Sequence, residues 1–319
     1  METIPLILDC DTGVDDALAL LVALLHPKAK LLGVTSVHGN IPVQKAAENN
    51  LSILKLFHRE DIPVAVGSAL PLAGENHFAF QVHGKDGLGE TYLSPGSLSP
   101  IDEPAALFIA RLAREHPGEI TLVATGPLTN VALAFLLEPE LPRLLRRVVV
   151  MGGAVTVPGN VTPLAEANIF NDPEAARRVL NAGFPLTLIG LDVTMKTLFG
   201  PKEMARLKNL AAEKPALQFI HRALAFYTDF YTPILGTAAC PLHDPLALAA
   251  ALDPSLVNCQ PMSLYVETAP GQARGATLAD RRHGRAKAFT SPPVDVALEV
   301  KAEDAVEFIF SALERARSQ

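Results

Sequence analysis

The sequence predicts an α/β protein in which a single open, mostly parallel sheet is flanked by helices. Short apolar runs alternate with longer amphipathic segments between residues 5 and 190, and such alternation is typical of parallel strands joined by helices. Of the 319 residues, 49% are hydrophobic and 19% are charged, which indicates a globular protein with a large core. No repeat, low-complexity tract or linker interrupts the chain, so we expect one domain over residues 1–319.

Each expected strand is a short apolar run, and each expected helix places its apolar residues three or four positions apart. The strands are expected at 5–9, 31–37, 62–67, 120–125, 147–153 and 185–190. The helices are expected at 15–25, 43–57, 103–116, 130–138 and 172–183, the last of them stopped by Gly183. Residues 200–252 are expected to be largely helical, and residues 302–316 to form a final amphipathic helix.

Two long loops follow expected strands. Residues 68–101 and 152–171 are rich in Gly, Pro, Asn and Ser, and loops of this length inside a compact domain are usually functional. In open α/β sheets, ligands bind beyond the carboxyl ends of the strands. We therefore expect the functional site at that edge of the sheet.

Charge and cysteine content exclude several classes of protein. A net charge of −7 argues against nucleic acid as a partner, and the basic stretch RRHGRAK at 281–287 is interpreted as a solvated loop. The cysteines Cys10, Cys240 and Cys259 form no CxxC pair, which favours a reducing, cytoplasmic location. We recognise no signal peptide and no run of 18 apolar residues that would predict a membrane span.

Four aspartates lie where the first expected strand gives way to the first helix. The stretch LILDCDTGVDDALALL places Asp9 and Asp11 at the strand end and Asp15 and Asp16 at the helix N-terminus, with Gly13 allowing a tight turn. One aspartate here would simply cap the helix, and a second could be solvated. Four carboxylates in a partly buried turn repel one another, so a bound cation is favoured over a purely structural cluster. Oxygen ligands without nearby cysteine indicate Ca²⁺ or Mg²⁺.

Three further stretches offer polar candidates for the same site. In LHDP, Asp244 could cap the following helix with Pro245 at its first position, and His243 could be an ordinary buried imidazole. Both become site candidates only if the fold brings them to the aspartates. VHGN at 37–40 and the loop 158–175 offer further amide and carboxyl groups. Turn chemistry can explain their asparagines, but such groups at strand ends also suit a polyhydroxyl ligand such as a sugar.

The stretch DCDTGVDDA resembles the DxDxxxDD signature of the inosine-uridine-preferring nucleoside hydrolases. The resemblance continues in order through VHGN, VHGKDGLG (82–89), ATGPLTN (124–130), VVVMGGAV (148–155), the ExN of Glu166–Asn168, and HDP at 243–245. This ordered set spans almost the whole chain and is more specific than the signature alone. It implies an α/β sheet with Ca²⁺ at the strand ends, an enzyme that hydrolyses ribonucleosides to free base and ribose, and a homodimer or homotetramer.

Carried over position by position, the resemblance assigns a role to each candidate. The Ca²⁺ ligands would be Asp11, Asp16, the backbone carbonyl of Thr125, and Asp244. The ribose would be held by Asp15 and Asn40 at the 2′- and 3′-hydroxyls and by Asn160, Glu166 and Asn168 at the 5′ end. Asp9 would not contact the cation or the ribose itself but would help to hold their ligands in place. The base would be covered by His83, Tyr227 and Tyr231, although the spacing of the two tyrosines also describes core residues.

The resemblance also implies a reaction. Cleavage passes through a ribosyl cation of oxocarbenium character, which nearby carboxylates would stabilise. Asp11 would take the proton of the attacking water as the general base, and Ca²⁺ would hold that water and lower its pKa. His243 would protonate the leaving base, because an ordinary imidazole titrates near neutral pH.

Two alternative functions stay open on the sequence alone. A haloacid-dehalogenase-like phosphatase also begins with a strand and a DxD motif, and it would use Asp9 as the nucleophile with Mg²⁺. A non-catalytic nucleoside- or ribose-binding protein could keep the cation site without turnover. The phosphatase explains neither the second aspartate pair nor the motifs VHGN and HDP. The sequence leaves the preferred nucleobase open.

Overall fold

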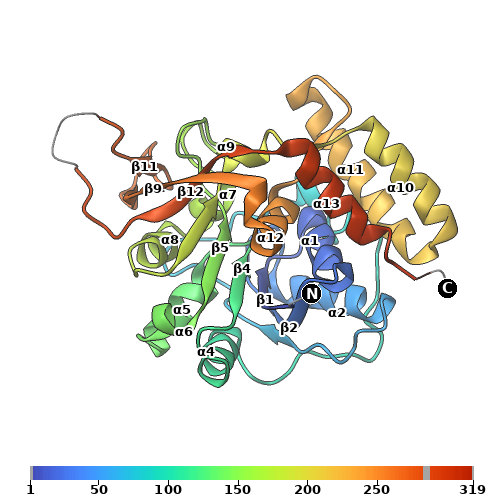
Figure 1. The fold of residues 1–319 in the computed structure, drawn as a ribbon, viewed down its shortest axis with the longest axis horizontal. Helices are drawn as coiled ribbons and strands as arrows, with labels where there is room; N and C mark the ends of the chain where they lie inside the picture. Colours follow the sequence, from blue (N-terminus) through green and yellow to red (C-terminus); the bar gives the residue numbers. More distant parts are fainter. Residues whose placement is uncertain (1–2, 283–287, 318–319) are drawn as a thin grey trace.

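The computed structural model describes residues 3–282 and 288–317. Its main sheet has eight strands in the order β3-β2-β1-β4-β5-β6-β12-β9 (Figure 1). Neighbouring strands are parallel except for β12 and β9, which pair antiparallel at one edge. The prediction of an open, mostly parallel α/β sheet is therefore confirmed.

The strands of the main sheet are β1 (Ile4–Cys10), β2 (Ala29–Ser36), β3 (Val64–Val66), β4 (Thr121–Ala124), β5 (Arg147–Met151), β6 (Leu186–Ile189), β9 (Val257–Met262) and β12 (Val294–Val300). Two short pairs lie outside it: β7 (Leu198–Phe199) with β8 (Cys240–Pro241), and β10 (Leu264–Val266) with β11 (Thr277–Ala279). Strand β3 is shorter than the expected 62–67, and Pro63, which has no N–H to donate, lies outside the ladder. Strands β9 and β12 were not expected, because both mix polar with apolar residues.

The expected helices are present as α1 (Val14–Leu25), α2 (Val43–Leu56), α4 (Ala105–Glu115), α5 (Thr129–Leu137), α8 (Pro173–Leu180), α10 (Pro201–Glu213), α11 (Gln218–Leu235), α12 (His243–Leu252) and α13 (Ala302–Leu313). Four short helices lie in the loops: α3 (Phe80–His83), α6 (Leu141–Leu144), α7 (Ala167–Asn171) and α9 (Leu191–Thr194). Single 3₁₀ turns occur at Pro215–Leu217 and Pro254–Leu256. The helices thus fall close to their predicted positions.

The sheet is buried on both faces. Along β1, Leu6 and Leu8 belong to one core and Ile7 to the other, because successive side chains of a strand point to opposite faces. The first core is completed by α1, α2, α12 and α13, and the second by α4, α5 and α8 (Figure 1). Burial on both faces explains why these strands are apolar along their length.

The strand order reverses beside β1. The chain runs outward from β1 through β2 to β3, and then returns to build β4, β5 and β6 on the other side. At the ends of β1 and β4, the Thr125 N–H donates to the Asp9 carbonyl at 2.8 Å. A crevice opens at such a switch point because the two adjoining connections leave in opposite directions. The aspartates that follow β1 therefore lie at the crevice.

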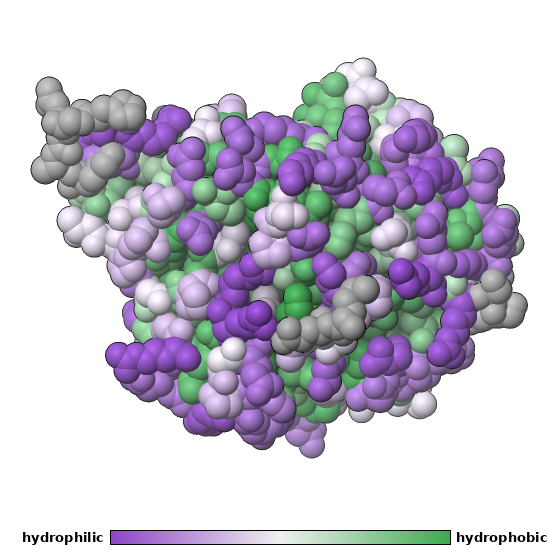
Figure 2. All heavy atoms as spheres, in the orientation of Figure 1, coloured by the Kyte–Doolittle hydropathy of each residue, from purple (hydrophilic) through white to green (hydrophobic). Residues whose placement is uncertain are grey.

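Among the described residues, no helix is both long enough and apolar enough to cross a membrane. Figure 2 shows one face of the molecule, where hydrophilic residues predominate and hydrophobic ones are scattered between them. Much of the basic stretch 281–287 lies outside the described residues, at 283–287. Its interpretation as a solvated loop stays a prediction.

A buried histidine lies just beyond β2. His38 is 0% exposed, and its Nε2 lies 3.0 Å from the Thr129 hydroxyl, which donates to Asp172 at 2.6 Å. His38 Nε2 must therefore be the donor to Thr129, which leaves Nδ1 unprotonated. Burial lowers the pKa of His38 to about 4, because the charged imidazolium would lose its hydration.

We expect His38→Gln to make the protein less sensitive to mild acid, since glutamine keeps an N–H donor but does not titrate. The unfolded chain binds a proton at His38 near pH 6.5 and the folded chain only near pH 4, so stability falls as the pH drops through that window. Between about pH 7.5 and 5, the wild type should lose about 2 kcal/mol more unfolding free energy than the variant. Urea unfolding at both pH values measures this difference, and equal losses would contradict it.

Candidate active site

The turn between β1 and α1 presents the aspartates at the carboxyl edge of the sheet. Asp16 accepts the Gly13 N–H at Oδ2 (2.8 Å) and the Thr125 hydroxyl at Oδ1 (2.7 Å). Asp11 is held by the Asn40 N–H, which donates to its Oδ2 at 2.6 Å. All four aspartates of the turn are buried, with at most 4% of any of them exposed. The four charges predicted to cluster here do so inside the protein.

Gly13 is required by its neighbours and not by its backbone conformation. The sequence suggested that it permits a tight turn, but its φ is −83°, a value that any residue adopts. A Cβ atom at this position would lie 2.4 Å from His83 Nδ1 and 2.8 Å from Asn40 Nδ2. The expected reason for this glycine was therefore wrong: it allows two loops to approach the end of α1.

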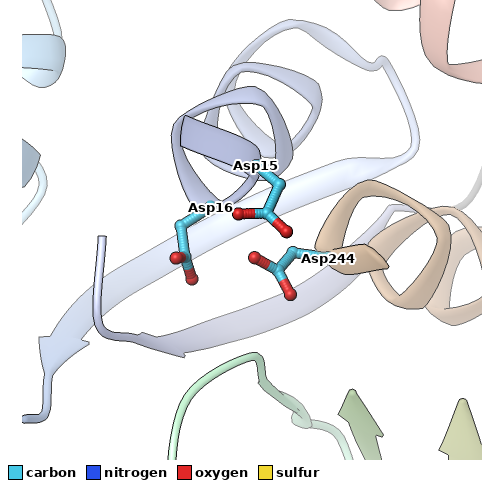
Figure 3. A group of neighbouring side chains, drawn as sticks. All are labelled: Asp15, Asp16 and Asp244. Atoms are coloured by element: carbon cyan, nitrogen blue, oxygen red, sulfur yellow. The ribbon is translucent and has the colours of Figure 1, made fainter. Parts of the chain in front are cut away.

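Asp244 joins the cluster from a distant part of the chain. Figure 3 shows Asp15 and Asp16 on α1 and Asp244 on α12, with their carboxylates turned toward one another. One oxygen of each lies within 4.8 Å of the others. The cap of α12 is Leu242, so the alternative in which Asp244 caps this helix is wrong. Asp244 instead lies in the first turn, where the helix dipole favours a negative charge.

Burial and mutual repulsion make this cluster costly to ionise. Burial, with the charge of neighbouring aspartates as a smaller cause, raises the pKa of Asp15 to about 7, and it raises the pKa values of Asp11 and Asp244 well above their usual range. Within the described part of the chain, Asp11 Oδ1 and Asp15 Oδ1 are buried without a hydrogen-bond partner. A divalent cation would neutralise the charges and engage these oxygens, so the donor set fits an oxygen-coordinated cation.

The distances between the carboxylates group the aspartates differently from the roles that the resemblance assigned to them. Asp15, which was assigned to the ribose, lies in the close trio with Asp16 and Asp244, whereas Asp11 lies outside it. The charges of Asp16 and Asp15 nevertheless contribute to the raised pKa of Asp11. Its assignment as a cation ligand stays a prediction.

Asp9 lies behind the cluster. Its Oδ1 accepts the Thr35 hydroxyl at 2.6 Å and the Asn130 amide at 2.8 Å. Burial raises its pKa to about 6, although these two donors oppose the shift. Asn130 could have been found as the polar residue that closes the motif ATGPLTN, but nothing in the apolar stretch around Thr35 marked that residue.

The residues assigned to the ribose 5′ end line one wall and are tied to the backbone. Glu166 caps α7 and accepts the N–H groups of Gly153, Asn168 and Ile169 at 2.9–3.2 Å. The Asn168 amide donates to the Thr125 carbonyl at 2.7 Å, which is the carbonyl expected to bind the cation. Asn160 lies exposed at the rim, where its Oδ1 accepts the Ala167 N–H at 3.0 Å.

Three of the candidate aromatic side chains lie together opposite this wall. Tyr227 and Tyr231 are 1% and 7% exposed, and their ring centroids are 4.9 Å apart. Tyr227 donates to Asp15 Oδ2 at 3.1 Å, and the Tyr231 hydroxyl lies 3.1 Å from His243 Nε2. The His83 ring is 5.4 Å from that of Tyr227. The two tyrosines thus pack in the first core, and their hydroxyls also reach the polar site.

Burial favours the neutral form of both site histidines. Burial lowers the pKa of His243 to about 4 and that of His83, which His243 also influences, to about 3. The expectation that His243 titrates near neutral pH was therefore wrong, because it is enclosed. Its Nδ1 lies 2.8 Å from the Thr194 hydroxyl, a partner that no sequence signal indicated. The Val14 N–H donates to His83 Nδ1 at 3.1 Å, which leaves the proton of His83 on Nε2.

These groups surround one cavity of about 680 Å³. The predicted residues that line it are Asp15, Asn40, His83, Thr125, Asn160, Glu166, Asn168, Tyr227, Tyr231, His243 and Asp244. Asp9, Asp11 and Asp16 do not line the cavity. A cavity of this size, with convergent polar groups and titratable residues of shifted pKa, is typical of an enzyme that binds a small molecule.

A cavity lined by carboxylates at the switch point of an open, mostly parallel sheet is typical of an α/β enzyme that acts on a small polar substrate. The sequence matches the profile of the inosine-uridine preferring nucleoside hydrolases over residues 6–307. The chain belongs to this family and is a ribonucleoside hydrolase, an enzyme that cleaves an N-glycosidic bond.

Similar proteins agree with this assignment. The chain is 42% identical over 280 residues to a pyrimidine-specific ribonucleoside hydrolase RihA of Shewanella oneidensis, covering 88% of this chain and 87% of the relative. It is 36% identical over 313 residues to uridine nucleosidase 1 of Arabidopsis thaliana, covering 97% and 92%. Among solved structures, it is similar to the plant nucleoside hydrolase PpNRh1, with a TM-score of 0.91, 34% identity, and coverage of 97% and 98%. A purine-preferring ribonucleoside hydrolase of Gardnerella vaginalis gives 0.89 at 33% identity, with the same coverage.

Proposed function

We propose that this protein is a Ca²⁺-dependent hydrolase that converts ribonucleosides to free base and ribose, with pyrimidine ribonucleosides preferred. The observation that carries the proposal is the meeting of Asp15, Asp16 and Asp244 within 4.8 Å beside a cavity with aromatic walls. The names of relatives at 41–42% identity, pyrimidine-specific ribonucleoside hydrolases, support the base preference.

The cation would be held by carboxylates from α1 and α12, with Asp11 and the Thr125 carbonyl as the further ligands assigned by the resemblance. Hard oxygen donors select Ca²⁺ or Mg²⁺. Ca²⁺ is favoured here because it takes more protein oxygens than Mg²⁺, which is usually held by one or two carboxylates and keeps several water ligands. When bound, the cation would supply positive charge that attracts the ribose hydroxyls and makes a water molecule more acidic. The unpartnered oxygens of Asp11 and Asp15 support this use of the site.

Asp11 is the proposed general base. The Asn40 N–H fixes Oδ2 at 2.6 Å, so Oδ1 is left to accept the proton of the attacking water. Loss of the base bond leaves positive charge on the ribosyl ring, and the buried carboxylates would stabilise that charge at fixed positions. Asp15 and Asn40 would hold the 2′- and 3′-hydroxyls, and Asn160, Glu166 and Asn168 the 5′ end.

His243 is the proposed acid for the leaving base. Its Nε2 lies 3.1 Å from the Tyr231 hydroxyl, which could pass a proton toward the base. A lowered pKa makes the imidazolium a strong acid, although it is scarce at neutral pH. His83, Tyr227 and Tyr231 would contact the base itself, and their shared position in the cavity supports this role.

Two observations weigh against the alternatives. Asp9, the nucleophile of a phosphatase, is 0% exposed, and its Oδ1 is occupied by Thr35 and Asn130. Against a nucleoside-binding protein without turnover, relatives at 36–42% identity are named as ribonucleoside hydrolases and a uridine nucleosidase.

The test is release of reducing sugar from a panel of nucleosides and nucleoside monophosphates, with and without EDTA. We expect ribose from nucleosides, fastest from uridine and cytidine, and none after chelation. Release of phosphate would instead support the phosphatase. Intact nucleoside bound without release of base would leave a binding protein.

Location and assembly are part of the same proposal. The three cysteines are free thiols, with Cys10 and Cys240 buried, which supports a reducing, cytoplasmic location. A homodimer or homotetramer is proposed from the family resemblance, and light scattering of the purified protein measures it.

A further inference from the structure

Two turns face each other at the floor of the cavity. The aspartate turn, residues 10–16, carries the carboxylates, and the His83 turn, residues 83–92, carries His83. They meet where the Val14 N–H donates to His83 Nδ1 at 3.1 Å. This one hydrogen bond links the imidazole to the aspartate turn but not the backbones of the two turns to each other, so their relative position depends on further contacts.

The His83 turn is internally rigid. The Asp86 carboxylate accepts the N–H groups of Leu88 and Glu90 at 2.9 Å and that of Tyr92 at 2.7 Å. The Gly89 N–H donates to the His83 carbonyl at 2.8 Å and closes the turn. A turn held in this way moves as a unit, so whatever holds Asp86 also determines where His83 lies.

Asn49 of α2 holds Asp86 to the aspartate turn. Its Nδ2 donates to the Asp86 carbonyl at 2.8 Å and to the Thr12 carbonyl at 3.3 Å, so one amide group bridges both turns. Asn49 is 1% exposed. Gly87 allows this close packing: its φ is +80°, and a Cβ there would lie 2.6 Å from Ile41 Cδ1, 3.0 Å from Asn49 Nδ2 and 3.1 Å from the Thr12 carbonyl.

We propose that Asn49 is a positioning residue that sets His83 against the cation-binding aspartates. The inference rests on the proposed function, because His83 is assigned to the base only there. Asn49 contacts two backbone carbonyls and acts through the turns to which they belong. Displacement of a substrate-contacting group by about 1 Å can cost about 10²-fold in rate, so loss of this bridge should slow cleavage of substrates whose base His83 contacts.

Asn50 provides a matched control on the same helix. It is 0% exposed and accepts the Thr12 hydroxyl at 2.9 Å, and its amide donates to the Ser36 hydroxyl at 3.1 Å. Within the described chain, its side-chain hydrogen bonds all lead to β1, β2 or the aspartate turn, and none to the His83 turn. Asn50→Ala therefore disturbs one turn, whereas Asn49→Ala uncouples the two.

The experiment compares uridine with p-nitrophenyl β-ribofuranoside, whose leaving group is not a nucleobase and therefore lacks the contact proposed for His83. For Asn49→Ala we expect kcat/KM for uridine to fall about 10²-fold and kcat/KM for the nitrophenyl substrate to stay within a few-fold of wild type. Asn50→Ala should change both substrates by the same factor. Asn49→Leu, which keeps the approximate volume of the side chain but has no N–H donor, should reproduce the uridine-selective loss and covers the case in which the cavity left by Asn49→Ala impairs folding.

Equal losses on the two substrates in Asn49→Ala and Asn49→Leu would overturn the inference and leave the proposed function intact. A wild-type protein that releases ribose from neither substrate would instead refute the proposed function, and the inference with it. These two failures are distinguished by the wild-type assay alone.

Discussion

Asp11→Ala is expected to lower ribose release from uridine by about 10³–10⁴-fold, the upper range for loss of a general base. Asp11 offers the attacking water an oxygen without a partner in the described chain, while the Asn40 N–H fixes the other oxygen at 2.6 Å. The variant should fold, because the loss of one accepted hydrogen bond is offset by relief of repulsion from Asp16 and Asp15. A reducing-sugar assay on the purified variant measures the effect.

Two controls separate the chemistry from the fold. Asp11→Asn keeps the size of the side chain and an oxygen for the Asn40 N–H, yet it should be nearly as slow as the alanine variant. Asp61→Asn, which alters an exposed carboxylate paired with Arg59 at 2.9 Å, should match the wild type. Because every leaving group requires water attack, both Asp11 variants should also be slow on p-nitrophenyl riboside. Turnover by Asp11→Asn within about tenfold of wild type would exclude Asp11 as the base.

The local parts of this architecture were accessible from sequence. The apolar run before Asp9 and the helical spacing after Asp16 predict β1 and α1, because burial on both faces of a parallel sheet leaves a continuous apolar strand. The aspartates then follow from their position at the strand end. Strand β12 was missed because VDVALEV carries charged residues within an apolar run, and a pattern of that kind does not distinguish an inner strand from an edge.

The long-range parts of the site were not accessible from the residues alone. Asp244 reaches Asp16 only because α12 packs beside α1, and no local pattern encodes that packing. The pKa of His243 depends on enclosure by Tyr231 and Thr194, which the motif HDP does not contain. In the sequence, nothing distinguishes Asn49 from the other polar residues of the helix α2, yet in the structure its amide bridges two loops. Residues of this kind are determined by tertiary contacts, so they emerge only when the fold is known.

The carboxylate trio predicts opposite effects of one substitution with and without a cation. In the presence of EDTA, Asp244→Asn should raise the free energy of unfolding by about 1–3 kcal/mol, the scale of an uncompensated polar group in a buried cluster. Burial and the charges of Asp15, Asp16 and Asp11 all disfavour ionised Asp244, and the neutral amide removes that repulsion while filling the same space.

With Ca²⁺ in excess the order should reverse. A ligand that binds only the folded protein adds about 2.7 kcal/mol at a concentration of 100 times Kd, and the wild type should gain this stability while Asp244→Asn gains little of it. Thermal unfolding of both proteins in EDTA, Ca²⁺ and Mg²⁺ measures the crossover, with Asp61→Asn expected to follow the wild type throughout. A variant that is less stable than wild type in EDTA and still responds fully to Ca²⁺ would show that Asp244 is a structural residue. The crossover itself cannot come from a packing defect, because a packing defect lowers stability under both conditions.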